Sequence, residues 1–177
     1  DILVRAGNGI ASTGGSLTLL SGSSTAGASG SVKLGSTNAG TAGVSGAVDI
    51  VSGNSVSGSS GAMLLTTGNA TAGRSGGITL AVGSGDSGIG GAVRLHGGRS
   101  TANDMIGTGG AVEILSGVGT TSASGRILLS TTTSGAVGSG LINISTGFSH
   151  IGTTGSFSIS SGDAAAGEAG DIDLLVG

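Results

Sequence analysis

Apolar residues recur along this chain in pairs that are separated by one variable residue, and the pairs return about every fifteen residues. The segment 46–60, GAVDIVSGNSVSGSS, shows one repeat, in which Val48 and Ile50 flank Asp49. Eight of the ten intervals between successive repeats are fifteen residues long, and the other two are sixteen and nineteen. Each of the eleven copies starts with a glycine, counted here as position 1: Gly15, Gly30, Gly46, Gly61, Gly76, Gly91, Gly110, Gly125, Gly140, Gly155 and Gly170.

Positions 3 and 5 are apolar in every copy, whereas position 4 varies freely. Side chains two residues apart share one face of a strand, so this alternation predicts that positions 3 and 5 face an interior and position 4 faces solvent. A helix would require apolar residues at i, i+3, i+4 and i+7, which no copy supplies. The expected structural core includes Leu17, Leu19, Val48, Ile50, Ile78, Leu80, Ile142 and Ile144.

A strand that returns at a short fixed period is typical of a solenoid, in which each repeat contacts mainly its neighbours. We therefore predict an all-β fold, a parallel β-solenoid or β-helix of about eleven 15-residue coils. One apolar pair per coil favours a flattened form with two sheets, and a triangular coil is the alternative. Residues 1–177 are expected to form a single domain cut from a longer repeat protein or filament, with 1–14 as a degenerate first coil.

The second half of each repeat consists mostly of Ser, Thr, Ala and Gly, and we expect it to return the chain to the next strand. The nineteen-residue copy carries RSTANDMIGTG in this half, which predicts a loop insertion at 98–109. Such a loop is a place for function, but solenoids also tolerate insertions neutrally. We favour the neutral interpretation.

Glycine is unusually abundant, with 41 residues, and proline, cysteine, tryptophan and tyrosine are absent. A disordered Gly/Ser linker is the alternative that this composition raises. Two unbroken apolar columns and a mean hydropathy of +0.41 argue against a solvated linker.

Charge and motifs exclude several classes of function. The net charge is −3, the six basic residues are scattered and aromatic residues make up 1%, which excludes a surface for binding nucleic acid. No run approaches the roughly 18 apolar residues of a membrane helix, so membrane insertion is not expected. HExxH, CxxC and GxxxxGK[ST] motifs are absent, and His96 and His150 lie in different columns. We expect no enzyme activity, no cofactor and no metal; GSGDSG at 83–88 resembles a calcium loop but occurs once.

Two Asn-x-Ser/Thr sequons occur, at Asn69 in a return and at Asn143 on a predicted strand. Either asparagine can accept an N-glycan if the chain is secreted by a eukaryote. Chance is the alternative, because the chain is rich in Ser and Thr.

The segments SGSSTAGASGSVKLGS, VSGNSVSGSSGAMLLTTGNATAGRSGGITL and STGFSHIGTTGSFSISSGDAAAGEAGDIDL carry a resemblance that extends over the whole chain. They resemble the Ser/Gly/Thr repeat arrays of very large surface proteins of algae and stramenopile-like microbes, and are similar in style to bacterial adhesin solenoids. The resemblance implies a structural or adhesive protein at the cell surface or outside the cell, forming a rigid rod or filament. It implies self-association, end to end or lateral, or binding to other surface or matrix components.

Ice binding is the alternative function, because β-solenoids of similar coil length host it. Ice binders of that style present flat outward ranks of threonine. The best candidate rank, which Val56, Asp86 and His150 interrupt, contains Thr25, Thr41, Thr71 and Thr120.

Overall fold

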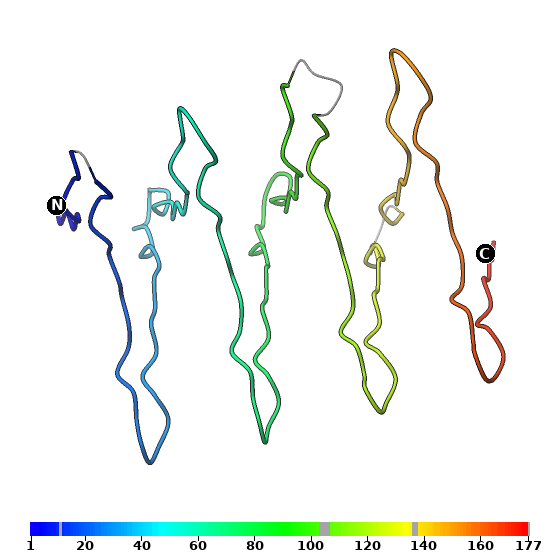
Figure 1. Ribbon diagram of the computed structural model, residues 1–177, viewed down its shortest axis with the longest axis horizontal. Coiled ribbons are helices and arrows are strands. Elements are labelled where there is room, and N and C mark those ends of the chain that lie inside the picture. Colours follow the sequence, from blue (N-terminus) through cyan, green and yellow to red (C-terminus); the bar gives the residue numbers. More distant parts are fainter. Residues whose placement is uncertain (11, 103–106, 136–137, 177) are drawn as a thin grey trace. The chain divides into compact units, whose positions relative to one another are not determined.

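The computed structural model describes residues 1–10, 12–102, 107–135 and 138–176. The chain divides into two units, Asp1–Ala81 and Val82–Gly177, and each is described by itself below. Within each unit the chain runs in long open loops, blue to cyan-green in the first unit and green to red in the second (Figure 1).

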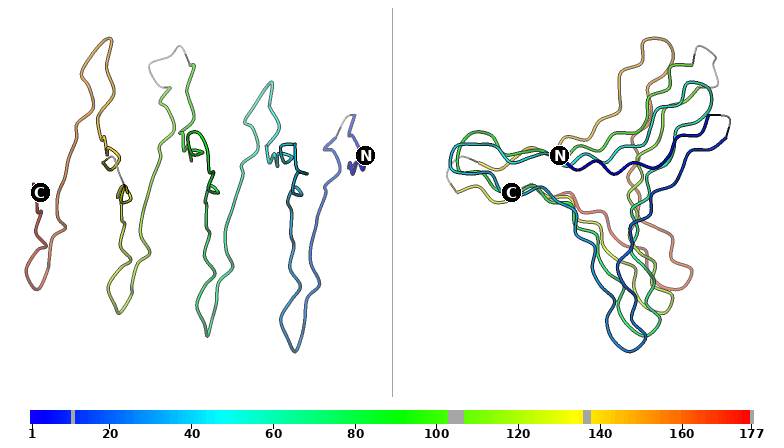
Figure 2. Two further views of the ribbon diagram at one scale, coloured as in Figure 1. Left: turned by 180° about the vertical axis from the view of Figure 1, so that it is seen from behind. Right: turned by 90° about the vertical axis from the view of Figure 1, so that its left-hand side faces the viewer.

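The prediction of a parallel β-solenoid is wrong, in its flattened and in its triangular form. Over the described residues the chain forms no helix and no strand, and therefore no sheet. Views from behind and from the side show the same bare trace (Figure 2). We call positions 2–6 of each repeat its apolar segment. None of the backbone hydrogen bonds between described residues joins the apolar segment of one repeat to the apolar segment of the next.

Two properties of the sequence explain why the apolar segments remain unpaired. Glycine loses more conformational freedom on ordering than any other residue, and every repeat contains several glycines. The returns offer mostly Ser, Thr, Ala and Gly, so they have little apolar surface with which to cover the side chains at positions 3 and 5. Each repeat therefore gains too little from burial to hold the next one beside it.

The side chains predicted to form the core lie outside any enclosed interior, because no described side chain is buried. At position 3 the exposed fraction of the large apolar side chains ranges from 45% for Ile142 to 64% for Val32. Leu64, at position 4, is 83% exposed. All eight residues that were predicted to form the core are exposed to solvent: Leu17, Leu19, Val48, Ile50, Ile78, Leu80, Ile142 and Ile144.

The fifteen-residue period reappears in the places where the chain bends. Bends lie at residues 25–27, 41–43, 56–58 and 71–73 in the first unit, and at 86–89, 120–122, 150–152 and 165–167 in the second. Nearly all of these bends fall at positions 11–13 of their repeats. The second half of the repeat therefore reverses the chain, as the composition predicts, although no sheet forms between the reversals.

Candidate functional site

A backbone hydrogen bond closes the return at the end of several repeats. The N–H of Gly30 donates to the carbonyl oxygen of Gly22, and the N–H of Gly125 donates to that of Gly117, in each case across eight residues and at 2.9 Å. The same bond joins Gly15 to Gly7 at 2.8 Å, within the segment that we predicted as a degenerate first coil. We call the stretch from position 7 to the next leading glycine the closed return.

The predicted loop insertion at 98–109 lies inside one such closed return. There the N–H of Gly110 donates to the carbonyl oxygen of Gly98 at 2.8 Å, across twelve residues in place of eight. Four additional residues are therefore accommodated without a change in the closing bond. Residues 103–106, which belong to this insertion, lie outside the described part of the chain.

The side chain at position 7 packs under the leading glycine of the next repeat. A Cβ atom placed on Gly30 would lie 3.3 Å from the Cβ atom of Ser21, and one placed on Gly140 would lie 3.3 Å from Cγ2 of Thr131. The hydroxyl of Ser21 also donates to the carbonyl oxygen of Gly30 at 2.8 Å. Thr67 makes the equivalent bond to Gly76 at 3.2 Å. The leading glycine is thus the residue that lets the two ends of a return approach.

Serine and glycine also shape the tips of the returns. Ser24 Oγ accepts a hydrogen bond from the N–H of Gly27 at 2.9 Å, which is a local side-chain turn. Near the ends of other returns, glycine adopts positive φ, as at Gly58 (124°) and Gly167 (130°). Glycine takes this conformation without the steric cost that a Cβ atom imposes.

Substituting Gly15 with alanine is expected to open the closed return that ends there. Its new Cβ atom would lie 3.1 Å from the Gly7 nitrogen, whereas a Cβ atom on neighbouring Gly14 meets nothing closer than 3.5 Å. Such a bond contributes about 0.5–1.5 kcal/mol, so the closed population should fall severalfold. The temperature coefficient of the residue 15 amide proton, measured by NMR, should become more negative in Gly15→Ala and stay unchanged in Gly14→Ala. Equal coefficients in the two variants would show that the leading glycine has no special role.

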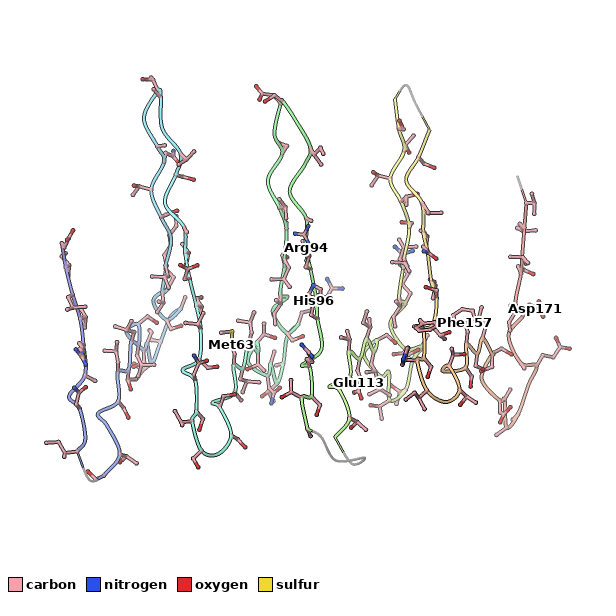
Figure 3. All side chains as sticks on the ribbon, turned by 90° about the horizontal axis from the view of Figure 1, so that it is seen from above. Met63, Arg94, His96, Glu113, Phe157 and Asp171 are labelled. Carbon is pink, nitrogen blue, oxygen red and sulfur yellow. The ribbon has the colours of Figure 1, made fainter. Side chains whose placement is uncertain are left out.

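The strongest candidate for a functional surface is the series of exposed apolar segments. In Figure 3 the side chains stand off the trace, among them Met63 and Phe157, which occupy position 3 of their repeats. No cavity is found among the described residues, so the apolar side chains face solvent directly. Within each unit the exposed apolar positions recur from repeat to repeat.

Several of the apolar segments carry a charged residue at position 4. Lys33 and Asp49 lie one repeat apart in the first unit, and Arg94 and Glu113 lie one repeat apart in the second. Within the part of the chain that the structure describes, none of these four groups takes part in an ion pair. The labelled side chains of Arg94 and Glu113 do not meet in Figure 3.

The threonines of the ice-binding alternative occupy equivalent places in their returns. Each begins a bend, and all four are exposed: Thr25, Thr41, Thr71 and Thr120. A flat rank also requires stacked repeats, and the described residues contain no sheet that would align them. The structure therefore does not bring these threonines together into one face.

Among the described residues, the histidines and carboxylates are not clustered as metal ligands would be. His150 lies edge-on to Phe148, with the ring centroids 6.5 Å apart and the planes at 64°. Within the described residues, no group of three or more His, Cys, Asp or Glu side chains is placed to hold one metal ion. The described residues also include no helix that is long and apolar enough to cross a bilayer.

Both sequon asparagines are exposed, Asn69 shortly before the bend at 71–73 and Asn143 in an apolar segment. We expect secretion of the chain from a eukaryotic cell to add N-glycans at these residues, because the acceptor amides are open to solvent. Treatment with an amidase specific for N-glycans should then lower the mass, and Asn69→Gln combined with Asn143→Gln should abolish that shift. A secreted wild-type chain of unmodified mass would contradict the expectation.

The sequence reasoning above overlooked the closed return, although two columns signal it. Position 7 is Ser or Thr in eight of the eleven repeats, and position 8 is glycine in nine. A small hydroxyl residue followed by glycine is what a close approach of two backbones requires. The apolar columns at positions 3 and 5 do not by themselves reveal this second pattern at positions 7 and 8.

Comparison of the chain with protein-family models, with curated proteins and with solved structures gives no match.

Proposed function

We propose that this chain is a non-catalytic structural or adhesive repeat protein that acts outside the cell and associates with further copies of itself to form filaments. One observation carries the proposal: the apolar side chains at positions 3 and 5 stay exposed in repeat after repeat along the chain. A surface of this kind, regular and long, suits lateral contact better than it suits the binding of a small molecule.

The extent of the exposed surface supports association. The chain exposes 17,720 Å² at a mass of 16.2 kDa. A compact monomer of this mass would expose about 7,500 Å² by the usual scaling of surface with mass. The difference, about 10,000 Å², is several times the roughly 1,600 Å² that a standard protein interface buries. A partner therefore has ample surface to cover.

The composition supports a structural role. Only 8% of the residues are charged, so electrostatic repulsion between copies is small for a chain of 177 residues. The Ser/Gly/Thr repeat style resembles that of large surface proteins, and an extracellular location follows from that resemblance. Exposed sequons at Asn69 and Asn143 are compatible with such a location.

Sedimentation velocity over a range of concentrations, followed by electron microscopy of the same samples, tests this proposal. We expect the sedimentation coefficient to rise with concentration and filaments to appear, because contact between copies removes apolar surface from water. A chain that stays monomeric up to its solubility limit would overturn the proposal.

A further inference from the structure

We propose that Asn8 is a site of spontaneous deamidation, at which the backbone nitrogen of Gly9 attacks the side-chain amide and the Arg5 guanidinium assists. Nη2 of Arg5 donates a hydrogen bond to Oδ1 of Asn8 at 3.1 Å. The attacking nitrogen belongs to the next residue along the chain, so the reaction closes a five-membered succinimide ring. The reaction needs no enzyme and no partner, and water is its only co-reactant.

The residue that follows Asn8 distinguishes it from the other asparagines. Asn8-Gly9 is the one Asn-Gly pair among the six asparagines of the chain. Glycine has no Cβ atom to crowd the approach of its nitrogen, and it reaches the backbone conformations that ring closure demands. The residues that follow the other five asparagines all carry side chains: Ala39, Ser55, Ala70, Asp104 and Ile144.

The Gly9 nitrogen is free to react in the structure. Residues 8 and 9 lie in neither a helix nor a strand, and both are exposed to solvent. Within the described part of the chain, the N–H of Gly9 donates no hydrogen bond. A nitrogen that is engaged in such a bond must break it before it can attack, and no such cost applies here.

The turn around Gly9 admits no larger residue. A Cβ atom placed on Gly9 would overlap the carbonyl oxygen of Ser12 and would lie 2.8 Å from that of Thr13. A side chain at this position would slow the reaction by crowding the nitrogen, but it does not fit the turn. The local fold therefore keeps the reactive pair together.

The Arg5 guanidinium lies at the atom on which negative charge develops. Attack at Cγ of Asn8 turns Oδ1 into an oxyanion, and a charged donor already bound to this oxygen stabilises the growing charge. Removing such a donor from a buried site lowers the rate about 100- to 1000-fold. Asn8 is open to water, which weakens the interaction, so we expect an effect of about three- to tenfold here.

The two steps balance without an oxidant or a reductant. The bond from the Gly9 nitrogen to Cγ of Asn8 forms as the bond from Cγ to Nδ2 breaks, and the proton of the Gly9 N–H passes through water to the leaving ammonia. Water then opens the ring at either carbonyl carbon. Opening at Cγ gives aspartate, and opening at the main-chain carbonyl carbon gives isoaspartate.

Both products change the return that the bond from Gly15 to Gly7 closes. The new carboxylate is ionised at neutral pH, so it makes the net charge of −3 more negative by one unit. Isoaspartate also adds one carbon atom to the main chain within this return. Deamidation therefore alters charge and chain length before the first regular repeat.

Peptide mapping of the full chain, produced in bacteria and kept at mildly alkaline pH, tests the site. Trypsin cleaves after Lys and Arg, so the peptide that ends at Lys33 contains Asn8 as its only asparagine, and another peptide contains only Asn143. The amide of Asn8 should be lost about tenfold faster than that of Asn143, which precedes a β-branched residue. The loss is measured as the mass change from amide to carboxyl, with aspartyl and isoaspartyl peptides separated by chromatography.

Arg5→Met isolates the contribution of the guanidinium. This variant should slow the loss at Asn8 about three- to tenfold, because the donor to the oxyanion is gone. Arg126→Met is the matched control, since it removes the same charge from the unit Val82–Gly177. The control should deamidate at Asn8 at the wild-type rate.

Each other outcome overturns a defined part of the proposal. Loss at Asn8 that is no faster than loss at Asn143 would overturn the site itself. An unchanged or faster rate in Arg5→Met would overturn the part assigned to Arg5, because the hydrogen bond would then do no more than anchor the amide. Equal slowing in Arg126→Met would attribute the effect to net charge and would also overturn the part assigned to Arg5.

Discussion

Association of this chain is expected to weaken at least about thirtyfold when Ile78 and Ile142 are both replaced by aspartate. Each isoleucine occupies position 3 and is about half exposed, at 51% and 45%. Full burial of such a side chain is worth about 1.5–3 kcal/mol, so about half of that is still to be gained on contact. Two sites then contribute about 2 kcal/mol, where 1.4 kcal/mol is tenfold, and an unpaired carboxylate in the contact adds a further cost.

The residues next to these isoleucines provide a matched control. Thr79→Asp combined with Asn143→Asp adds the same two charges one residue further along, at position 4. This control should associate like the wild type in sedimentation velocity. Equal losses in both double variants would mean that net charge, and not the apolar row, governs association.

The second large effect is expected at Gly152, where valine should rearrange the bend at 150–152. Gly152 has a φ of 101°, a conformation that L-residues disfavour, and a β-branched side chain most of all. The cost of holding valine there is about 1–3 kcal/mol, enough to make the native bend a minor conformation. The contact between the Phe148 and His150 rings and the hydrogen bond from Ser149 Oγ to the Ile151 carbonyl should both be lost.

Gly147→Val isolates the contribution of φ. Neither Gly147 nor Gly152 has a neighbour within 4 Å of an added Cβ atom, and only Gly152 has positive φ. Cross-relaxation between the Phe148 and His150 ring protons, measured by NMR, should persist in Gly147→Val and vanish in Gly152→Val. Loss of the signal in both variants would attribute the effect to the bulk of valine and not to the backbone.

Local features of the repeat were predictable from the sequence because they depend on neighbouring residues. Glycine recurs near position 13, and Gly58, Gly88, Gly152 and Gly167 there take positive φ at the bends. The Ser/Thr column at position 7 supplies hydroxyls such as that of Ser21 to the closing glycine. Turn chemistry of this kind acts over a few residues, so a single repeat already contains the information.

The residues of the candidate surface could be named from the sequence, but whether other parts of the chain cover them could not. Alternation singles out positions 3 and 5 as two apolar columns, and position 3 is the less exposed of the two, as Ile142 and Ile144 illustrate at 45% and 60%. The interior that these rows were expected to fill does not exist among the described residues. Alternation records which side chains share a face, and it is silent on what covers that face.

What the sequence alone determined about this protein is the fifteen-residue period, the position of each bend and the identity of the apolar rows. The tertiary structure alone decided whether one apolar segment lies against the next, and over the described residues it does not. The reason is that pairing between repeats must outweigh the entropy of ordering a glycine-rich return, a balance that the apolar pattern does not contain. The closing bond from Gly30 to Gly22 needs no such long-range contact, and it forms.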